Sequence, residues 1–379
     1  MGLNKELDGI TVVSIEQAVA APYCGLLLAD AGARVIKVER KEGDLARGYD
    51  KGANGQSTFF AWLNRGKESI CLNIKDPIDR GLLFAMLEKA DVLLSNLAPG
   101  ALERSGFVAK DLRAKNPGLI TCQVNGYGRE GPAAKKKAYD FLVQAESGVA
   151  AVTGTADGPA RVGVSLVDIS SGLTAFSAIL RALIQRGKTG KGIDISLSMF
   201  DVMADWMNMP LMGHRYMGGA PKRVGLTHSL IAPYGAYQAG DGNQVLIAIQ
   251  SNREWQVFCE KILENSALGT DARFADNTQR TANREEMDEL IDAAFANYSR
   301  SDLMQTLENH QIACAQLNSV EDLSNHPYLR NLEVNFADTV VSVADLAVPI
   351  EGDRAVDVPD LNQHGDALRE EFEGRANEV

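Results

Sequence analysis

Short apolar runs alternate with helical patterns through the first third of the chain, and this alternation restricts the possible folds more than any other feature. The segments 9–15 (GITVVSI) and 33–39 (ARVIKVE) resemble buried strands, and the helical pattern of 22–32 between them ends at Gly32. An amphipathic helix is expected at 77–90. Further strands are expected at 69–74, 91–96, 119–124 and 191–198. This order predicts an α/β fold whose parallel sheet is covered on both faces and binds ligands at the carboxyl ends of its strands.

A chain of 379 residues, 45% of them hydrophobic, exceeds what one core usually organises, so two domains are expected. The first region runs to residue 199 and predicts a large Rossmann-like domain. The second region, 225–325, predicts a smaller α+β domain that begins with a hairpin at 234–249, around a Gly-Asp-Gly-Asn turn. The Met-rich segment 200–209 is interpreted as a helix whose methionines fill the core. Further helices are expected at 252–263 and 283–298.

Charge and motif content exclude several classes of partner. The net charge of −12 disfavours a nucleic acid or an anionic membrane as the main partner. The five cysteines form no CxxC pair and the histidines show no metal-ligand spacing, so reduced thiols and no metal site are expected. No apolar run reaches the roughly 18 residues of a membrane span, and a cytoplasmic location is expected. Because no GxGxxG follows the first strand, a nicotinamide or flavin dinucleotide is disfavoured.

One carboxylate, Asp168, lies where a β-branched run meets the start of a helical pattern. From Leu173 to Ile184 apolar residues recur at three- and four-residue spacing, and Gly187 predicts the end of this helix. An aspartate at such a start is typical of an N-cap. The alternative is a carboxylate that the helix dipole keeps ionised and that attacks an activated acyl group. The pattern alone supports both readings.

Several segments taken together resemble the class III coenzyme A transferases, the CaiB/BaiF family, which also includes formyl-CoA transferase, carnitine CoA-transferases, mesaconyl-CoA and succinyl-CoA transferases and the α-methylacyl-CoA racemases. The resemblance covers nearly the whole chain, and no single segment would be specific. The segments are 7–40, 59–77, 96–107, 139–154, the surroundings of Asp168 with 186–192, and 233–242.

The resemblance implies a reaction. In transferases of this family the aspartate that matches Asp168 is the nucleophile, which forms a mixed anhydride and then an aspartyl-CoA thioester. CoA would pass from an acyl-CoA to a carboxylic acid, with small dicarboxylic acids such as succinate, mesaconate, malate or citramalate expected. Coenzyme A would enter as the acyl-CoA substrate, with no tightly bound cofactor. The reactive intermediate would have to be kept from water.

The resemblance also implies an assembly. Family members form homodimers of two interlocked, ring-like subunits, in which the C-terminal segment returns to the large domain. By this likeness 330–379 joins the large domain, and 200–224 and 326–329 become linkers.

Binding residues are carried over by matching motifs. Basic side chains near strand ends or helix starts suit the CoA phosphates, and an apolar channel suits the pantetheine arm. Tyr139, Arg223 and His228 are the candidates for substrate contact. Arg40 and Lys75 could equally be solvated surface charges, and lone histidines are more often structural than ligating. The candidates for CoA contact are Ala18, Val19, Arg40, Leu72, Asn73, Lys75, Arg104 and Lys137.

Two alternatives to a transferase remain. The racemase branch has a Gly-His-Asp motif where this chain has Ala138-Tyr139-Asp140. A tyrosine side chain titrates near pH 10 in water and is a poor base at neutral pH, so the racemase reading lacks its main residue. Asp140 is assigned to the first turn of a helix rather than to catalysis. The other alternative is a CoA-binding protein without catalysis, which the presence of Asp168 disfavours.

Overall fold

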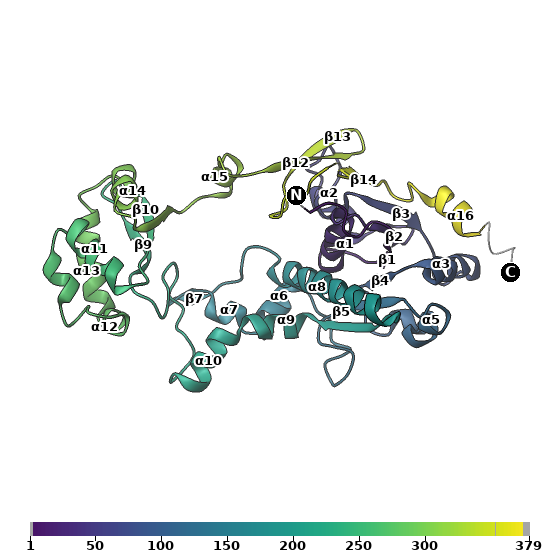
Figure 1. Cartoon of the computed structure of the whole chain (residues 1–379), viewed down its shortest axis with the longest axis horizontal. Helices are drawn as coiled ribbons and strands as arrows, with labels where there is room; N and C mark the ends of the chain where they lie inside the picture. Colours follow the sequence, from purple (N-terminus) through teal and green to yellow (C-terminus); the bar gives the residue numbers. More distant parts are fainter. Residues whose placement is uncertain (1–2, 353, 374–379) are drawn as a thin grey trace. The chain divides into compact units, whose positions relative to one another are not determined.

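The structure, a computed structural model, describes residues 3–352 and 354–373 and divides into two compact units (Figure 1). The large unit comprises Met1–Ala150, Arg161–Met209 and Arg330–Val379. The small unit comprises Ala151–Ala160 and Pro210–Leu329. The large unit is therefore assembled from three separate stretches of the chain.

A six-stranded parallel sheet forms the centre of the large unit, in the order β3-β2-β1-β4-β5-β8. This confirms the expected α/β fold with a parallel sheet. The third strand lies two residues before its predicted position, because its first residue, Lys67, is a buried lysine that sequence patterns assign to a surface. The strands are β1 (Thr11–Ile15), β2 (Arg34–Glu39), β3 (Lys67–Cys71), β4 (Val92–Ser95), β5 (Ile120–Asn125) and β8 (Asp194–Ser198).

Alternate residues of each strand feed two cores, one on either face of the sheet. Val12 points to the side covered by α1 (Ala20–Asp30) and α8 (Leu166–Thr189). Val13 points to the side covered by α3 (Pro77–Lys89), α5 (Ala109–Lys115) and α16 (Gly365–Glu373) (Figure 1). Each face is apolar because a parallel sheet is buried on both sides.

Helix α8 passes the length and mean-hydropathy test for a membrane span among the described residues. Its buried side chains, such as Val167, Ala175 and Ile179, belong to the core that it shares with α1 and the sheet. The helix continues to Thr189 and ends at Gly190 in the left-handed conformation, so the predicted stop at Gly187 is wrong. Glycine within a helix lowers its stability without ending it.

The C-terminal stretch adds a small sheet to the large unit. Its strands are β12 (Asn331–Phe336), β13 (Thr339–Ala344) and β14 (Asp357–Val358), in the order β13-β12-β14. Phe336 packs against Phe60 of α2 (Thr58–Asn64), and Arg354 pairs with the buried Asp30 at 2.7 Å. The imidazole Nδ1 of His364 accepts the backbone N–H of Ser69 beside the outermost strand of the large sheet.

The small unit is an antiparallel sheet, in the order β11-β10-β9, with helices packed on it. Its hairpin turns through Gly-Asp-Gly at 240–242, as expected. The strands and helices are β9 (Tyr234–Gln238), β10 (Gln244–Ala248), β11 (Ala313–Gln316), α11 (Asn252–Lys261), α12 (Asn277–Ala282), α13 (Arg284–Phe295), α14 (Arg300–Asn309) and α15 (Val320–Ser324).

The Met-rich segment 200–209 extends over two helices, α9 (Met199–Trp206) and α10 (Asn208–Tyr216), and its interpretation as core filling is wrong for one methionine. Met203 is fully buried and Met207 packs against the core, but Met209 is 52% exposed. The reason is that α10 buries Pro210 and Gly213 and leaves its methionines on the surface. The remaining elements are η1 (Leu45–Gly48), α4 (Ala101–Arg104), α6 (Asp140–Glu146), α7 (Val149–Val152), β6 (Gly154–Thr155), β7 (Gly158–Pro159) and η2 (Ser266–Thr270).

Candidate active site

Asp168 lies in the first turn of α8, but it is not the N-cap, which is Ser165. Within the described parts of the chain, no protein group donates a hydrogen bond to its carboxylate. Burial, together with the nearby charge of Asp140, raises the pKa of Asp168 to about 7. Loss of water and a like charge therefore oppose the ionisation of Asp168 that the helix dipole favours.

Asp140, the first residue of α6, caps α8 from outside the helix. Its Oδ1 accepts the backbone N–H groups of Val167 at 2.7 Å and Asp168 at 3.2 Å. Its Oδ2 accepts the Nε2 group of Gln144, a buried residue of the same helix, at 2.7 Å. The predicted place of Asp140 in a first turn is confirmed, and the contacts add its function as a cap.

Helix α8 packs closely against α1, and its small residues Ser170, Ser171 and Gly172 are buried. Gly172 is the one that faces α1. A Cβ on Gly172 would lie 2.5 Å from the carbonyl oxygen of Ala20 and 3.1 Å from the Cβ of Tyr23. The close approach fixes the start of α8, and with it Asp168, relative to the amino terminus of α1.

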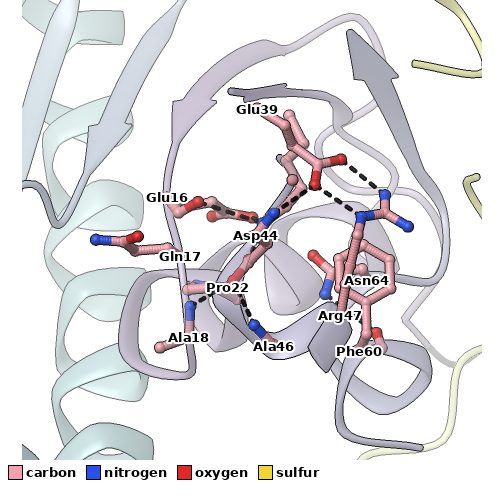
Figure 2. A network of polar contacts seen from close by, with 12 residues as sticks. Glu16, Gln17, Ala18, Pro22, Glu39, Asp44, Ala46, Arg47, Phe60 and Asn64 are labelled. Carbon is pink, nitrogen blue, oxygen red and sulfur yellow. Dashed lines mark hydrogen bonds and ion pairs between the residues drawn. The ribbon is translucent and has the colours of Figure 1, made fainter. Parts of the chain in front are cut away.

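The turn between β1 and α1 is held by side chains from other loops. Ala18 has a φ of 65°, in the left-handed region, and donates its N–H to Asp44 Oδ1 at 2.9 Å. Gln17 exchanges two hydrogen bonds through its backbone with the side chain of Asn96. The side chain of Gln17 points away from the polar network behind this turn (Figure 2). Val19 follows as the buried N-cap of α1.

Four fully buried charges form that polar network. Lys37 Nζ lies 2.7 Å from Asp44 Oδ2, and Lys67 Nζ lies 2.6 Å from Glu16 Oε1. Burial lowers the pKa of Lys67 to about 8 despite the charge of Glu16. Burial also opposes the charge of Lys37, but the carboxylates of Glu16 and Asp44 outweigh it and raise the pKa of Lys37.

The network continues toward the surface through Glu39. The guanidinium of Arg47 pairs with Glu39 Oε1 at 2.7 Å and stacks on the ring of Phe60, 3.7 Å from its centroid (Figure 2). Arg47 is thus the outermost residue of the network. The backbone N–H of Asp44 donates to Glu39 Oε2 at 3.0 Å and links Glu39 to the buried charges.

A pocket of about 130 Å³ opens beside this network, at the carboxyl ends of β1 and β2. Of the residues expected to contact CoA, Arg40 and Leu72 line it. The side chain of Arg40 is 56% exposed and its Nε donates to the carbonyl of Gly43, whereas Leu72 is buried. Arg40 and Leu72 were predicted to contact CoA from separate sequence motifs, and in the structure they line the same pocket.

The other candidates for CoA contact lie in separate places. Asn73 and Lys75 are exposed in the loop after β3, where Asn73 donates its N–H to Asp79. Arg104 is exposed at the end of α4 and donates to the carbonyl of Pro99 at 3.3 Å. Lys137 is exposed in the loop before α6.

The three candidates for substrate contact also differ in their surroundings. Tyr139 is the N-cap residue of α6 and is 67% exposed. Arg223 donates to the carbonyl oxygens of Thr155 and Ala151 within the small unit. His228, also in the small unit, stacks on Tyr234 with ring centroids 5.3 Å apart.

Sequence reasoning missed two residues near the site, Asp44 and Tyr49. Asp44 precedes η1, accepts the N–H of Ala46 and is the N-cap of that short helix, a signal that the sequence did offer. Tyr49 follows η1 and is half exposed; burial and the charges of Asp44 and Asp168 raise its pKa. No sequence signal indicates that the charge of Asp168 acts on Tyr49, because only the tertiary fold brings the two within electrostatic range.

Comparisons with known proteins agree with this architecture. A family model for CoA-transferase family III matches residues 7–364. The acetyl-CoA:oxalate CoA-transferase of Acetobacter aceti is 35% identical over 96% of this chain and 95% of its own. The succinate–glutarate CoA-transferase of Agrobacterium fabrum is 32% identical over 93% of this chain and 87% of its own. The crystal structure of a CaiB/BaiF family protein from Brucella suis superposes with a TM-score of 0.83 at 32% identity, over 97% of this chain and 100% of that one.

Proposed function

The chain belongs to CoA-transferase family III, and from this premise we propose that it transfers CoA from an acyl-CoA to a carboxylic acid through covalent intermediates on Asp168. One observation carries the assignment of Asp168: its half-buried carboxylate receives no hydrogen bond from any described residue. A carboxylate without donors keeps its electron pairs available for attack on an acyl carbon.

The proposed steps conserve the energy of the thioester. A carboxylate oxygen of Asp168 attacks the thioester carbonyl, the C–S bond breaks, and CoA leaves as a thiolate. The thiolate attacks the Asp168 carbonyl carbon of the mixed anhydride, releasing the donor acid and forming an aspartyl-CoA thioester. An acceptor carboxylate then repeats the two steps in reverse, which frees Asp168. The protein supplies a site that water does not enter freely, because water would hydrolyse the anhydride.

Binding of the CoA moiety is proposed at the pocket beside Arg40 and Leu72. Its place at the carboxyl ends of parallel strands is where α/β sheets bind ligands. The exposed guanidinium of Arg40 offers charge for a phosphate, and Leu72 offers an apolar wall for the pantetheine arm. Asn73, Lys75, Arg104 and Lys137, with the turn at Ala18 and Val19, are proposed to complete the contacts.

The acceptor and donor acids are proposed to be small dicarboxylates of the succinate, mesaconate, malate or citramalate type. Relatives named for oxalate and for succinate with glutarate support this class. Tyr139, Arg223 and His228 are proposed to contact the acid. We also propose that the protein is a cytoplasmic homodimer of interlocked subunits. A monomer found by light scattering would contradict the homodimer.

Incubation with succinyl-CoA and a panel of dicarboxylic acids, analysed by mass spectrometry, tests the proposal. We expect new CoA esters in the wild type, none in Asp168→Ala, and a hydroxamate at Asp168 after hydroxylamine treatment of the acylated enzyme. Exchange that continues in a folded Asp168→Ala variant would refute the role of Asp168. Deuterium uptake at the α-carbon of a 2-methylacyl-CoA without an acceptor acid would instead favour the racemase reaction.

A further inference from the structure

We propose that Asp140 is a positioning residue that occupies the amide groups at the amino terminus of α8 and thereby withholds them from the carboxylate of Asp168. This inference rests on the proposed function in one respect: Asp168, whose carboxylate lacks these hydrogen-bond donors, is taken to be the nucleophile. It assigns to Asp140 a role in the reaction beyond that of a residue in a first turn.

The hydrogen bonds of the first turn carry the argument. The four amide groups that begin a helix have no partner within it and ordinarily bind a nearby carboxylate. Here the amides of the first three helical residues all have acceptors outside the helix. Leu166 donates to the carbonyl of Val164 at 2.8 Å, while Ile169 makes the first bond within the helix, to the carbonyl of Ser165 at 3.0 Å. The amides of Val167 and Asp168 both donate to Asp140, so neither is left for the side chain of Asp168.

Asp140 is itself held in place for this task. Gln144, which is fully buried, donates to its Oδ2 and uses its own Oε1 to accept the N–H of Val162 at 2.9 Å. This chain of contacts links α6 to the segment that leads into α8. An acceptor fixed on both oxygens can hold the amides without turning toward Asp168.

The other titratable groups around Asp168 do not replace Asp140. Tyr49 lies close enough for the Asp168 charge to raise its pKa, and Tyr139 acts on Tyr49 in the same direction. On α1, the nearby Tyr23 has its pKa raised by burial and is influenced by Arg65 rather than by Asp168. Among the acids of the elements packed against α8, Glu146 pairs with Lys136, Asp30 with Arg65 and Arg354, and Asp194 with Arg129. Helix α9 adds Asp201 and Asp205.

The consequence is chemical. A carboxylate stabilised by helix amides would be weakly basic and a poor nucleophile, whereas one faced by a like charge and deprived of donors retains its basicity. The same arrangement gives Asp168 its raised pKa of about 7. Asp140 therefore fixes the helix start and, at the same time, keeps the nucleophile reactive.

Two neutral variants test this inference, Asp140→Asn and Asp140→Ala. Asparagine removes the charge but keeps an oxygen for the amides, with its NH₂ facing Gln144, whereas alanine also frees the two amides, so the alanine variant should show the larger effect. In both we expect the pKa of Asp168 to fall by about 1 unit or more, as ¹³C spectroscopy of the aspartate carboxyls reports. The acidic limb of the pH profile of kcat/KM should shift to lower pH together with the pKa of Asp168. We expect kcat to fall, while KM for the acyl-CoA changes less than about twofold.

The control is Asp201→Asn, which changes an acid in the first turn of α9 and is expected to leave the profile unmoved. If the pKa of Asp168 and the acidic limb stay where they are in the folded Asp140 variants, the proposal is wrong. The ¹³C titration needs no turnover. If Asp168 is not the nucleophile, the Asp168→Ala variant will still exchange CoA. That result is independent of the titration of the Asp140 variants.

Discussion

The carboxylate of Asp44 accepts the backbone N–H of Ala18 at 2.9 Å, in a turn where Ala18 holds a left-handed φ of 65°. Such a conformation is strained for any residue except glycine, so it persists only where surrounding groups enforce it. The other oxygen of Asp44 binds Lys37 at 2.7 Å in the buried network. A strained turn at the proposed CoA site is thus tied directly to four buried charges.

Replacing Asp44 by alanine should therefore affect both stability and binding. It leaves Lys37 short of a buried partner, and we expect a loss of about 3–5 kcal/mol in the free energy of unfolding. Release of Ala18 should also raise KM for the acyl-CoA more than it lowers kcat. Urea unfolding and steady-state kinetics measure both. The control Asp76→Ala removes the N-cap of α3 and should cost only about 1 kcal/mol; equal losses would contradict a special role for Asp44.

Gly172→Ala should destabilise the large unit, because its new Cβ would meet the carbonyl of Ala20 at 2.5 Å. We expect a cost of about 1–3 kcal/mol, together with lower activity as α8 moves from α1. Gly187→Ala is the matched control in the same helix, since nothing lies within 4 Å of its added Cβ. Alanine there should stabilise by up to about 1 kcal/mol. A higher melting temperature for Gly172→Ala than for Gly187→Ala would contradict close packing at Gly172.

Asp168→Asn should stabilise the fold at alkaline pH and not at acidic pH. The native pKa of about 7 lies above the unfolded value of about 4, so the folded wild type binds more protons between these limits. Its stability is therefore highest below pH 4 and declines as the pH rises to about 7. The asparagine variant lacks this decline and should be more stable by on the order of 2–4 kcal/mol at pH 8. Thermal unfolding from pH 4 to pH 8.5 checks this, and a pH-independent difference would count against it.

Lys67 and Glu16 should be coupled in a double-mutant cycle. Lys67→Met leaves Glu16 with only the longer contact to Lys37, at 3.3 Å, and should cost about 3–5 kcal/mol. Adding Glu16→Gln removes the orphaned charge, so the double variant should be markedly more stable than the sum of the single losses predicts. Chemical denaturation of the four proteins gives the coupling energy. Strict additivity would show that the pair contributes nothing specific.

Arg40→Ala should weaken acyl-CoA binding without unfolding the protein, because the Arg40 side chain is 56% exposed. Loss of one charged phosphate contact corresponds to a rise in KM of about 5- to 30-fold. KM of the variant should also respond less to added salt. Lys188→Ala, at the exposed end of α8, is the control and should leave KM unchanged. An unchanged KM in Arg40→Ala would move the CoA phosphates away from this pocket.

The sequence predicted the central sheet well because its strands are short segments rich in apolar and β-branched residues, such as 119–124 for β5. It failed where a residue contradicts its usual environment. The buried Lys67 made the start of β3 hard to predict, and the exposed Met209 resembles a core residue by composition alone. The hydrophobic pattern of a segment indicates which of its residues can be buried. It does not indicate which other segment of the chain packs against them.

The candidate site was predicted in part for a similar reason. Asp168 was found because it interrupts an apolar pattern at a helix start. Its partner Asp140 lies 28 residues earlier, and no periodicity connects the two. The N-cap interpretation was wrong because a cap can come from another helix, and sequence rules describe only caps within the same segment.

The division of the large unit into three stretches has a consequence for how the protein is made. Residues after 330 supply Arg354 for the buried Asp30 and His364 for the edge of β3, so these partners are translated last. A growing chain on the ribosome holds its first sheet with one edge unprotected until those residues emerge. Synthesis that stalls in the small unit would therefore release a product inclined to aggregate, and chaperones would be needed most during that interval.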